Sequence, residues 1–187
     1  RGRGAGRGRA GHVASLWGGR AATRGAPGAT WALGDSITAG YASTVDANRR
    51  WPNLLAARLQ ATPRLRQVAV MDQGISGNRT LHDLIGPNAL ARFDRDVLLA
   101  PGAKWGVLWE GTNNIGSPGT FGLSQEVVSA DDIIFRYRQP IDRAQEQGPK
   151  TYGRTPRPFK QPAIAGCHPP AGRLTRPAIT HSTRTSR

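Results

Sequence analysis

Short apolar runs that alternate with segments of helical periodicity constrain most strongly what this chain can fold into. Each run is bounded by turn-forming residues and is too short for a helix, which is typical of a buried strand. The expected strands are residues 30–33, 68–71 and 105–109. The expected helices are residues 51–59, residues 88–98 and a segment that begins near Ser129 and ends before Gly148. Strands that alternate with helices predict an α/β fold, a three-layer α/β/α sandwich around a short parallel sheet.

Proline and glycine mark the places where this pattern is weakest. Residues 115–122 contain Gly116, Pro118 and Gly119, and we expect a long loop there because both residue types disfavour helix interiors. Pro140 lies inside the last expected helix, where a proline costs about 3 kcal/mol or forces a kink. Residues 150–156 are a candidate fourth strand of poor composition.

Each expected strand ends in a short loop rich in glycine, serine or asparagine. Ser36 follows Gly34 and Asp35 after the first strand, Gly77 lies in the loop after the second, and Asn113 follows the third. Because the carboxyl ends of neighbouring parallel strands lie at one edge of a sheet, these loops should meet there. Together they would supply a hydroxyl nucleophile, an exposed backbone N–H and a side-chain amide, which can form an oxyanion hole. The alternative, that these residues only form turns, is the better interpretation of any one loop alone.

The three loops resemble the first three sequence blocks of the SGNH, or GDSL-type, esterases and lipases. The matching residues are Gly34-Asp35-Ser36, Gly77 within 74–78 and Asn113 within 111–113, and the wider likeness covers residues 34–159. The resemblance implies the flavodoxin-like fold of that family and a nucleophile at Ser36. It implies that the N–H groups of Ser36 and Gly77 and the amide of Asn113 bind the oxyanion. The reaction would be hydrolysis of a small acyl or acetyl ester through an acyl-enzyme, without a metal or other cofactor.

The last sequence block of that family, an aspartate and a histidine three residues apart, has no counterpart in this chain. The histidine is the base that activates the serine, and the aspartate orients it. The last aspartate is Asp142, and Ala165 stands three residues before His168. His168-Pro169 still resembles the His-Pro of the block, so His168 is the candidate base. His82 is better interpreted as a surface or capping residue. We expect low or absent activity unless His168 acts as the base.

The net charge of +14 comes from the two ends of the chain, because residues 31–148 carry all 12 acidic residues and an equal number of basic ones. We therefore expect three parts. They are a basic Gly/Arg-rich tail at 1–29, an SGNH hydrolase-like domain at 30–159 and a basic Pro/Arg/Thr-rich tail at 160–187. Low hydrophobicity and high charge predict disorder in both tails. The abrupt change in composition favours the further hypothesis that a shifted reading frame encodes them, which would leave the sheet incomplete at its carboxyl-terminal end.

The alternative function is that of a decayed, non-catalytic hydrolase domain whose basic tails bind nucleic acid or another polyanion. The absence of regular Arg-Gly-Gly repeats with interleaved aromatics argues against nucleic acid. No apolar run has the length of a membrane span, and the start of the chain has no signal-peptide pattern, although relatives in the family are often secreted. The single cysteine, Cys167, cannot form an internal disulfide. Oligomeric state, compartment and the acyl and alcohol groups of the substrate stay open.

Overall fold

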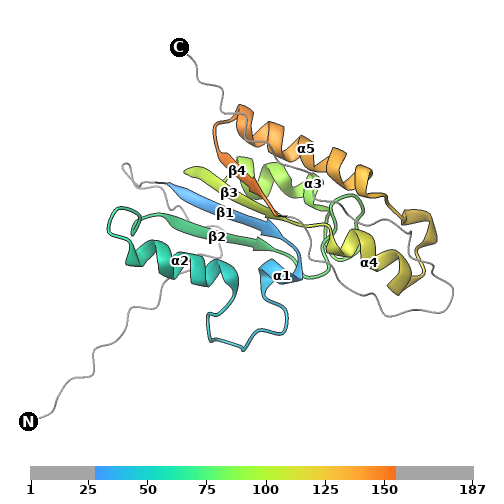
Figure 1. The fold of residues 1–187 in the computed structure, drawn as a ribbon, viewed down its shortest axis with the longest axis horizontal. Coiled ribbons are helices and arrows are strands. Elements are labelled where there is room, and N and C mark those ends of the chain that lie inside the picture. Colours follow the sequence, from blue (N-terminus) through green and yellow to red (C-terminus); the bar gives the residue numbers. More distant parts are fainter. Residues whose placement is uncertain (1–27, 155–187) are drawn as a thin grey trace, which may run out of the picture.

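The computed structural model describes residues 28–154, which form a four-stranded sheet with helices on both faces (Figure 1). The strand order is β2-β1-β3-β4, and every strand pair is parallel. The strands are β1 (Ala29–Gly34), β2 (Ala69–Gly74), β3 (Ala103–Trp109) and β4 (Lys150–Gly153). One face is covered by α2 (Trp51–Ala61), and the other by α3 (Ala89–Phe93) and α5 (Ala130–Glu146). The predicted three-layer α/β fold is confirmed.

The ends of three strands lie level at the carboxyl edge of the sheet. Gly34, the last residue of β1, pairs with Gly74 of β2 and with Trp109 of β3. The segments that follow are α1 (Ser36–Ala39), the loop after β2 and α4 (Thr112–Phe121). They emerge side by side at this edge (Figure 1), as the parallel topology predicts.

The main core lies between the sheet and the layer formed by α3, α5 and the π-helix η1 (Asp94–Leu98). Trp31 of β1 is fully buried and packs edge to face on Phe93, with ring centroids 5.9 Å apart. Gly106 of β3 leaves room for the indole, since a Cβ built there would lie 1.7 Å from Trp31. The other buried members of the cluster are Ala29, Leu33, Met71, Ala89, Val97, Leu108 and Ala144. Burial of each large apolar side chain contributes about 1.5–3 kcal/mol.

Two helices form where the sequence predicts them. In α2, Pro52 occupies the first turn, where the N–H that proline lacks has no intrahelical acceptor. The start of α5 has a capping box, in which Ser129 and Asp132 each accept a hydrogen bond from the backbone N–H of the other. The same helix continues through Pro140, which is buried together with Ala144 on its apolar face. Burial of that face offsets the cost of the proline.

Residues 115–121 belong to the helix α4, so the prediction of a long loop there is wrong. Pro118 lies inside α4, and glycines in the left-handed conformation lie at both ends, Gly111 with φ of 103° and Gly122 with φ of 69°. The N–H of Gly122 bonds to the carbonyl of Pro118 and closes the helix. Asn114 and Pro118 are buried. Tertiary packing therefore outweighs the weak intrinsic helix propensity of this segment.

The helix expected from Asn88 onward changes its winding part of the way along. Asn88 caps α3 as predicted. At Asp94 the α-helix gives way to η1, in which the N–H of Leu99 bonds to the carbonyl of Asp94, five residues earlier. The expected helix of residues 88–98 is therefore present, and its second half is a π-helix. The buried side of α3 also includes a charged residue, Arg92.

The remaining elements connect these parts. A short 3₁₀-helix, η2 (Ser124–Glu126), joins α4 to α5, and β4 is the expected fourth strand at the edge of the sheet. Among residues 28–154 no helix has both the length and the apolar composition to cross a membrane. Residues 1–27 and 155–187, which include almost all of the two expected tails, lie outside the described residues.

Candidate active site

Ser36 follows β1 directly and is the first residue of α1. Asp35 precedes it in an extended conformation and caps the helix, because its Oδ1 accepts a hydrogen bond of 2.9 Å from the N–H of Ile37. As the first helical residue, Ser36 has no intrahelical acceptor for its own N–H. Its side chain is half-buried, and its Oγ has no hydrogen-bond partner among residues 28–154. Both groups can therefore contact a ligand at this edge of the sheet.

Glycines allow α1 to lie directly against the strand ends. A Cβ at Gly34 would lie 2.1 Å from Oγ1 of Thr38, and a Cβ at Gly74 would lie 2.3 Å from the backbone nitrogen of Ala39. Such distances are too short for any side chain, so only glycine fits at these two positions. The placement of Ser36 thus depends on close backbone packing of α1 on β1 and β2.

Gly77 lies in the loop after β2 with φ of 77°, in the left-handed region that favours glycine. A Cβ there would also lie 2.5 Å from Cδ1 of Ile85. The next residue, Asn78, is anchored by a hydrogen bond of 2.8 Å from its Nδ2 to the carbonyl of Pro87. Within the described part of the chain, the N–H of Gly77 has no hydrogen-bond partner. It is available to a ligand oxygen.

Asn113 lies in the first turn of α4, and its side chain reaches the loop after β2. Its Nδ2 donates one N–H to the carbonyl of Asn78 at 2.9 Å. A side-chain amide has two N–H groups, and the second makes no hydrogen bond to any residue of 28–154. The neighbouring Asn114 is buried, and its Oδ1 accepts from the N–H of Thr80 at 2.6 Å. Two adjacent asparagines thus join α4 to the loop that contains Gly77.

Of the four histidines in the sequence, His82 lies within the described residues. It is half-buried in the loop after β2. Its carbonyl accepts a hydrogen bond of 3.2 Å from Nε of Arg79. Its imidazole makes no hydrogen bond to any residue of 28–154, Ser36 included. His168, the predicted base, lies outside the described residues. Its role stays a prediction.

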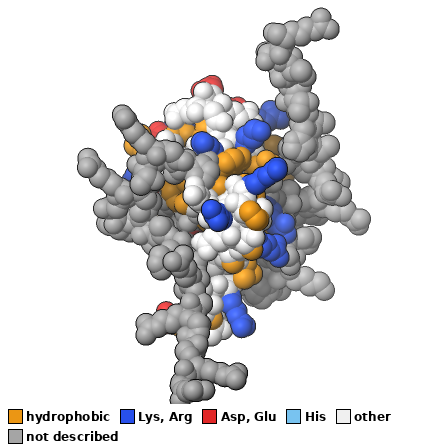
Figure 2. Space-filling view, turned by 90° about the vertical axis from the view of Figure 1, so that its left-hand side faces the viewer, with side chains coloured by type: hydrophobic (Ala, Val, Ile, Leu, Met, Phe, Trp, Pro, Cys, Tyr) orange, Lys and Arg blue, Asp and Glu red, His pale blue; other side chains and the backbone are white. Residues whose placement is uncertain are grey.

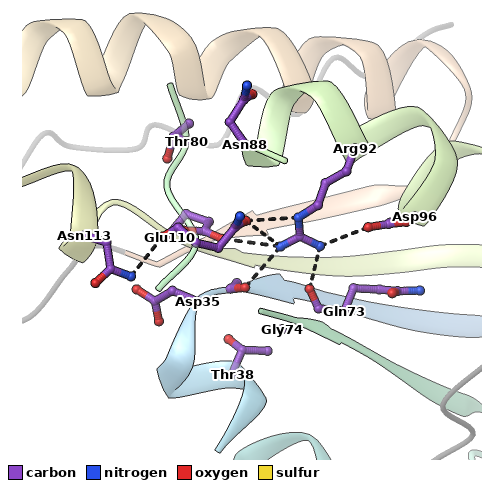
Figure 3. Close-up of polar contacts among 12 residues, drawn as sticks. Asp35, Thr38, Gln73, Gly74, Thr80, Asn88, Arg92, Asp96, Glu110 and Asn113 are labelled. Carbon is purple, nitrogen blue, oxygen red and sulfur yellow. Dashed lines mark hydrogen bonds and ion pairs between the residues drawn. The ribbon is translucent and has the colours of Figure 1, made fainter. Parts of the chain in front are cut away.

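Arg92, which the sequence analysis did not single out, joins all three strand ends (Figure 3). Its guanidinium donates to the carbonyl oxygens of Gly34 at 3.2 Å and Gln73 at 2.7 Å. It makes two further hydrogen bonds, of 2.8 and 3.0 Å, to Oδ1 of Asn78. Oε1 of Glu110 lies 3.5 Å away. The sequence carries no local signal for this network, because one of its acceptors, the carbonyl of Gly34, lies 58 residues away along the chain.

Two carboxyl groups next to Arg92 differ in protonation. Burial alone would raise the pKa of Asp96, but hydrogen bonds from Arg95 and Arg92 hold this pKa below its usual range. Burial raises the pKa of Glu110 to about 8, nearby Asp35 adds to this effect, and Arg92 opposes it. Glu110 is therefore largely protonated at neutral pH. The main counter-charge of Arg92 is Asp96, whose carboxylate lies 3.0 Å from the guanidinium.

Tyr137 of α5 fixes the end of β3 from the helical layer. Its hydroxyl accepts a hydrogen bond of 2.9 Å from the N–H of Glu110 and donates one to the carbonyl of the same residue. Burial raises the pKa of Tyr137, which keeps the hydroxyl neutral. Burial likewise raises the pKa of Asp35. Residues 28–154 contain no cluster of three or more His, Cys, Asp or Glu side chains that could hold a metal ion.

Fold and site together define an SGNH-type hydrolase scaffold, in which the three sequence blocks follow three adjacent strands. The profile of the GDSL-like lipase/acylhydrolase family matches residues 32–177. The chain belongs to this family. The matched range includes Ser36, Gly77 and Asn113, and it extends beyond the described residues to include His168. A comparison of the sequence with curated proteins gives no match.

The structure is also similar to solved esterases. AlinE4, an SGNH-hydrolase family esterase, aligns with a TM-score of 0.51 at 18% identity, over 67% of this chain and 57% of that one. A catalytic mutant of Axe2, an acetylxylan esterase from Geobacillus stearothermophilus, aligns with a TM-score of 0.55 at 18% identity, over 69% and 59%. LAE5, an alpha/beta hydrolase enzyme from the metagenome of Lake Arreo, Spain, aligns with 0.51 at 21%, over 68% and 60%. The chain thus spans less than two thirds of the length of these proteins, and the likeness establishes the fold.

Proposed function

We propose that this chain hydrolyses small esters through an acyl-enzyme on Ser36. The proposal is supported by three groups that lie on adjoining loops and have no hydrogen-bond partner among residues 28–154: the Oγ of Ser36, the N–H of Gly77 and one amide N–H of Asn113. Membership of a lipase and acylhydrolase family supports the same reaction class.

In this mechanism, Ser36 Oγ forms a bond to the carbonyl carbon of the ester. The N–H groups of Ser36 and Gly77 and the amide of Asn113 stabilise the negative charge that develops on the carbonyl oxygen. The alcohol then leaves with a proton, and water releases the acyl group as a carboxylic acid. Removal of one such oxyanion donor typically lowers turnover about 10²–10³-fold.

A base must accept the proton of Ser36, because a serine hydroxyl is a weak nucleophile at its free pKa. We assign this role to His168. The family match extends to residue 177 and so includes His168, and His168-Pro169 resembles the His-Pro of the last family block. Ala165 replaces the aspartate that orients the base, and loss of that aspartate in a serine protease lowers turnover about 10⁴-fold. A slow enzyme is therefore expected.

The substrate class is short acyl or acetyl esters. An acetyl ester is the first substrate to test, since the similar structures include an acetylxylan esterase. A slow turnover makes covalent trapping of the nucleophile a better first assay than product formation.

The test is to label the chain with a fluorophosphonate probe and to locate the label by peptide mass spectrometry. Ser36→Ala and His168→Ala are the informative variants. Ser76→Ala, an exposed serine in the adjoining loop, and His82→Ala are their matched controls. We expect label on Ser36 that both informative variants abolish and both controls retain.

Two other outcomes would change the proposal. Label that persists in His168→Ala but disappears in Ser36→Ala would retain the nucleophile and exclude His168 as the base. A folded chain that takes no label at all would overturn the hydrolase proposal, because the scaffold would then lack its chemistry.

A second candidate function is the binding of a polyanion such as nucleic acid, and one surface feature favours it. The face at the amino ends of the strands, opposite to the loops of the site, carries exposed basic side chains without ion-pair partners among the described residues. They are Arg64, Arg66, Lys104 and Lys150. Figure 2 shows lysine and arginine side chains across this face. Such a surface would act independently of Ser36.

A further inference from the structure

We propose that Arg92 is a positioning residue, which holds the loops of the oxyanion hole in register. The inference rests on the proposed ester hydrolysis. Arg92 cannot itself contact a substrate, since its side chain is fully buried. It would act through the groups that do contact one.

Arg92 hydrogen-bonds to residues at the ends of β1 and β2 and lies close to Glu110 at the end of β3, near each proposed functional group. Its Nη2 donates to the carbonyl of Gly34, two residues before Ser36. Its Nη2 and Nε donate to Oδ1 of Asn78, the residue after Gly77. Its Nη2 also lies 3.5 Å from the carboxyl group of Glu110, in the loop that leads to α4. Figure 3 shows these contacts around one guanidinium.

Asn78 connects Arg92 to the third oxyanion donor. Its Oδ1 is held by Arg92, and its Nδ2 donates to the carbonyl of Pro87. With the side chain fixed in this way, the backbone carbonyl of Asn78 accepts the hydrogen bond from Nδ2 of Asn113. The direction of the second amide N–H of Asn113 therefore depends on Asn78, and the place of Asn78 depends on Arg92.

The planar shape of the guanidinium is essential to this arrangement. Its five N–H groups are all engaged, with Gly34, Gln73, Asn78 and Asp96 as acceptors. Lysine has three donors on a single nitrogen and cannot reproduce this fork. If Arg92 only stabilised the fold, a buried positive charge of any shape would serve. If it positions the loops, the planar arrangement of its N–H donors is required.

The experiment compares Arg92→Lys with two controls. Arg95→Lys changes an exposed arginine of the same helical segment that also pairs with Asp96. Val97→Ala removes apolar contacts in η1, and so destabilises the core without touching the three loops. For each variant, the rate constant of fluorophosphonate labelling at Ser36 is measured under conditions in which the protein is folded. Amide hydrogen exchange is followed in parallel by mass spectrometry.

For Arg92→Lys we expect labelling to slow on the order of tenfold to a hundredfold, because the oxyanion donors lose their alignment. Hydrogen exchange should accelerate in residues 74–80 and 110–114, and the two controls should label at the wild-type rate. A folded Arg92→Lys that labels at the wild-type rate would overturn the inference. So would equal slowing in Val97→Ala, since loss of stability would then be the cause.

Two further arms keep the inference separate from the proposed function and from a failure to fold. If Arg92→Lys does not fold, Asn78→Ala removes the side-chain hydrogen bonds of Asn78 to Arg92 and Pro87 while Arg92 stays in place. This variant should slow labelling similarly, and normal labelling would contradict the relay. If the wild-type chain takes no label, the hydrolase proposal fails, but the positioning role of Arg92 can still be tested by hydrogen exchange. Acceleration confined to the two loops supports positioning, and a uniform change or none contradicts it.

Discussion

Glu110 is a buried carboxyl group at the end of β3, and its environment sets its protonation state. Burial raises its pKa from 4.5 to about 8. A raised carboxyl pKa means that the folded state binds a proton more tightly than the unfolded chain between these two values. The free energy of unfolding therefore decreases as the pH rises through this window. Each unit of pKa difference corresponds to about 1.4 kcal/mol, so the effect is large enough to measure.

Substitution of Glu110 by glutamine, Glu110→Gln, should remove this pH dependence, because the amide resembles the protonated acid and cannot ionise. We expect similar unfolding free energies for variant and wild type near pH 5, and a more stable variant at pH 8 by a few kcal/mol at most. Urea unfolding at both pH values measures the difference. Asp35 and Asp72, whose pKa values burial also raises, are present in both proteins and largely cancel. An equal stability difference at both pH values would contradict the assigned protonation state.

At the scale of the elements, α5 links the helical layer to the site. Its apolar side packs on the core through Ala144 and Ile141, and its Tyr137 holds the backbone of Glu110. The helix starts at the capping box formed by Ser129 and Asp132. The stability of this start should therefore contribute to the stability of the whole domain.

Replacement of the capping serine, Ser129→Ala, should lower the free energy of unfolding by about 1 kcal/mol, because one backbone N–H of the first turn loses its acceptor. Thermal or urea unfolding measures the change. Ser124→Ala, an exposed serine in η2 without a capping bond, is the matched control and should leave stability unaltered. Equal stability of Ser129→Ala and wild type would show that the capping box does not contribute.

At the scale of the whole molecule, the basic charge is separated from the proposed catalytic edge. The exposed residues Arg64, Arg66, Lys104 and Lys150 lie at the amino ends of the strands, whereas Ser36 lies at their carboxyl ends. The two proposed functions would therefore use opposite ends of the strands, and each can be tested without disturbing the other.

If the basic face binds polyanions, a single-stranded DNA oligonucleotide should bind at low salt and dissociate as salt increases. Each phosphate contact releases counterions, so log K should fall with log[salt] by about 0.7 per contact. Fluorescence anisotropy at several salt concentrations measures the slope. Reversal of charge in Lys104→Glu with Lys150→Glu should reduce both affinity and slope. Absent or salt-insensitive binding would exclude this function.

The sequence by itself determined the features that depend on a few neighbouring residues. Apolar runs indicated the strands, Asn88 and Ser129 indicated helix starts, and the alternation of elements indicated a parallel sheet. Because parallel strands end at one edge, the side-by-side arrangement of the loops with Ser36, Gly77 and Asn113 followed from the topology.

Only the tertiary structure decided the features that depend on distant contacts. The segment around Pro118 is helical because packing outweighs its local preference. Arg92 looks like an ordinary surface arginine in the sequence, yet one of its acceptors, the carbonyl of Gly34, is 58 residues away along the chain. Local patterns act over one or two helical turns. A buried charge is defined by partners that the fold alone brings together.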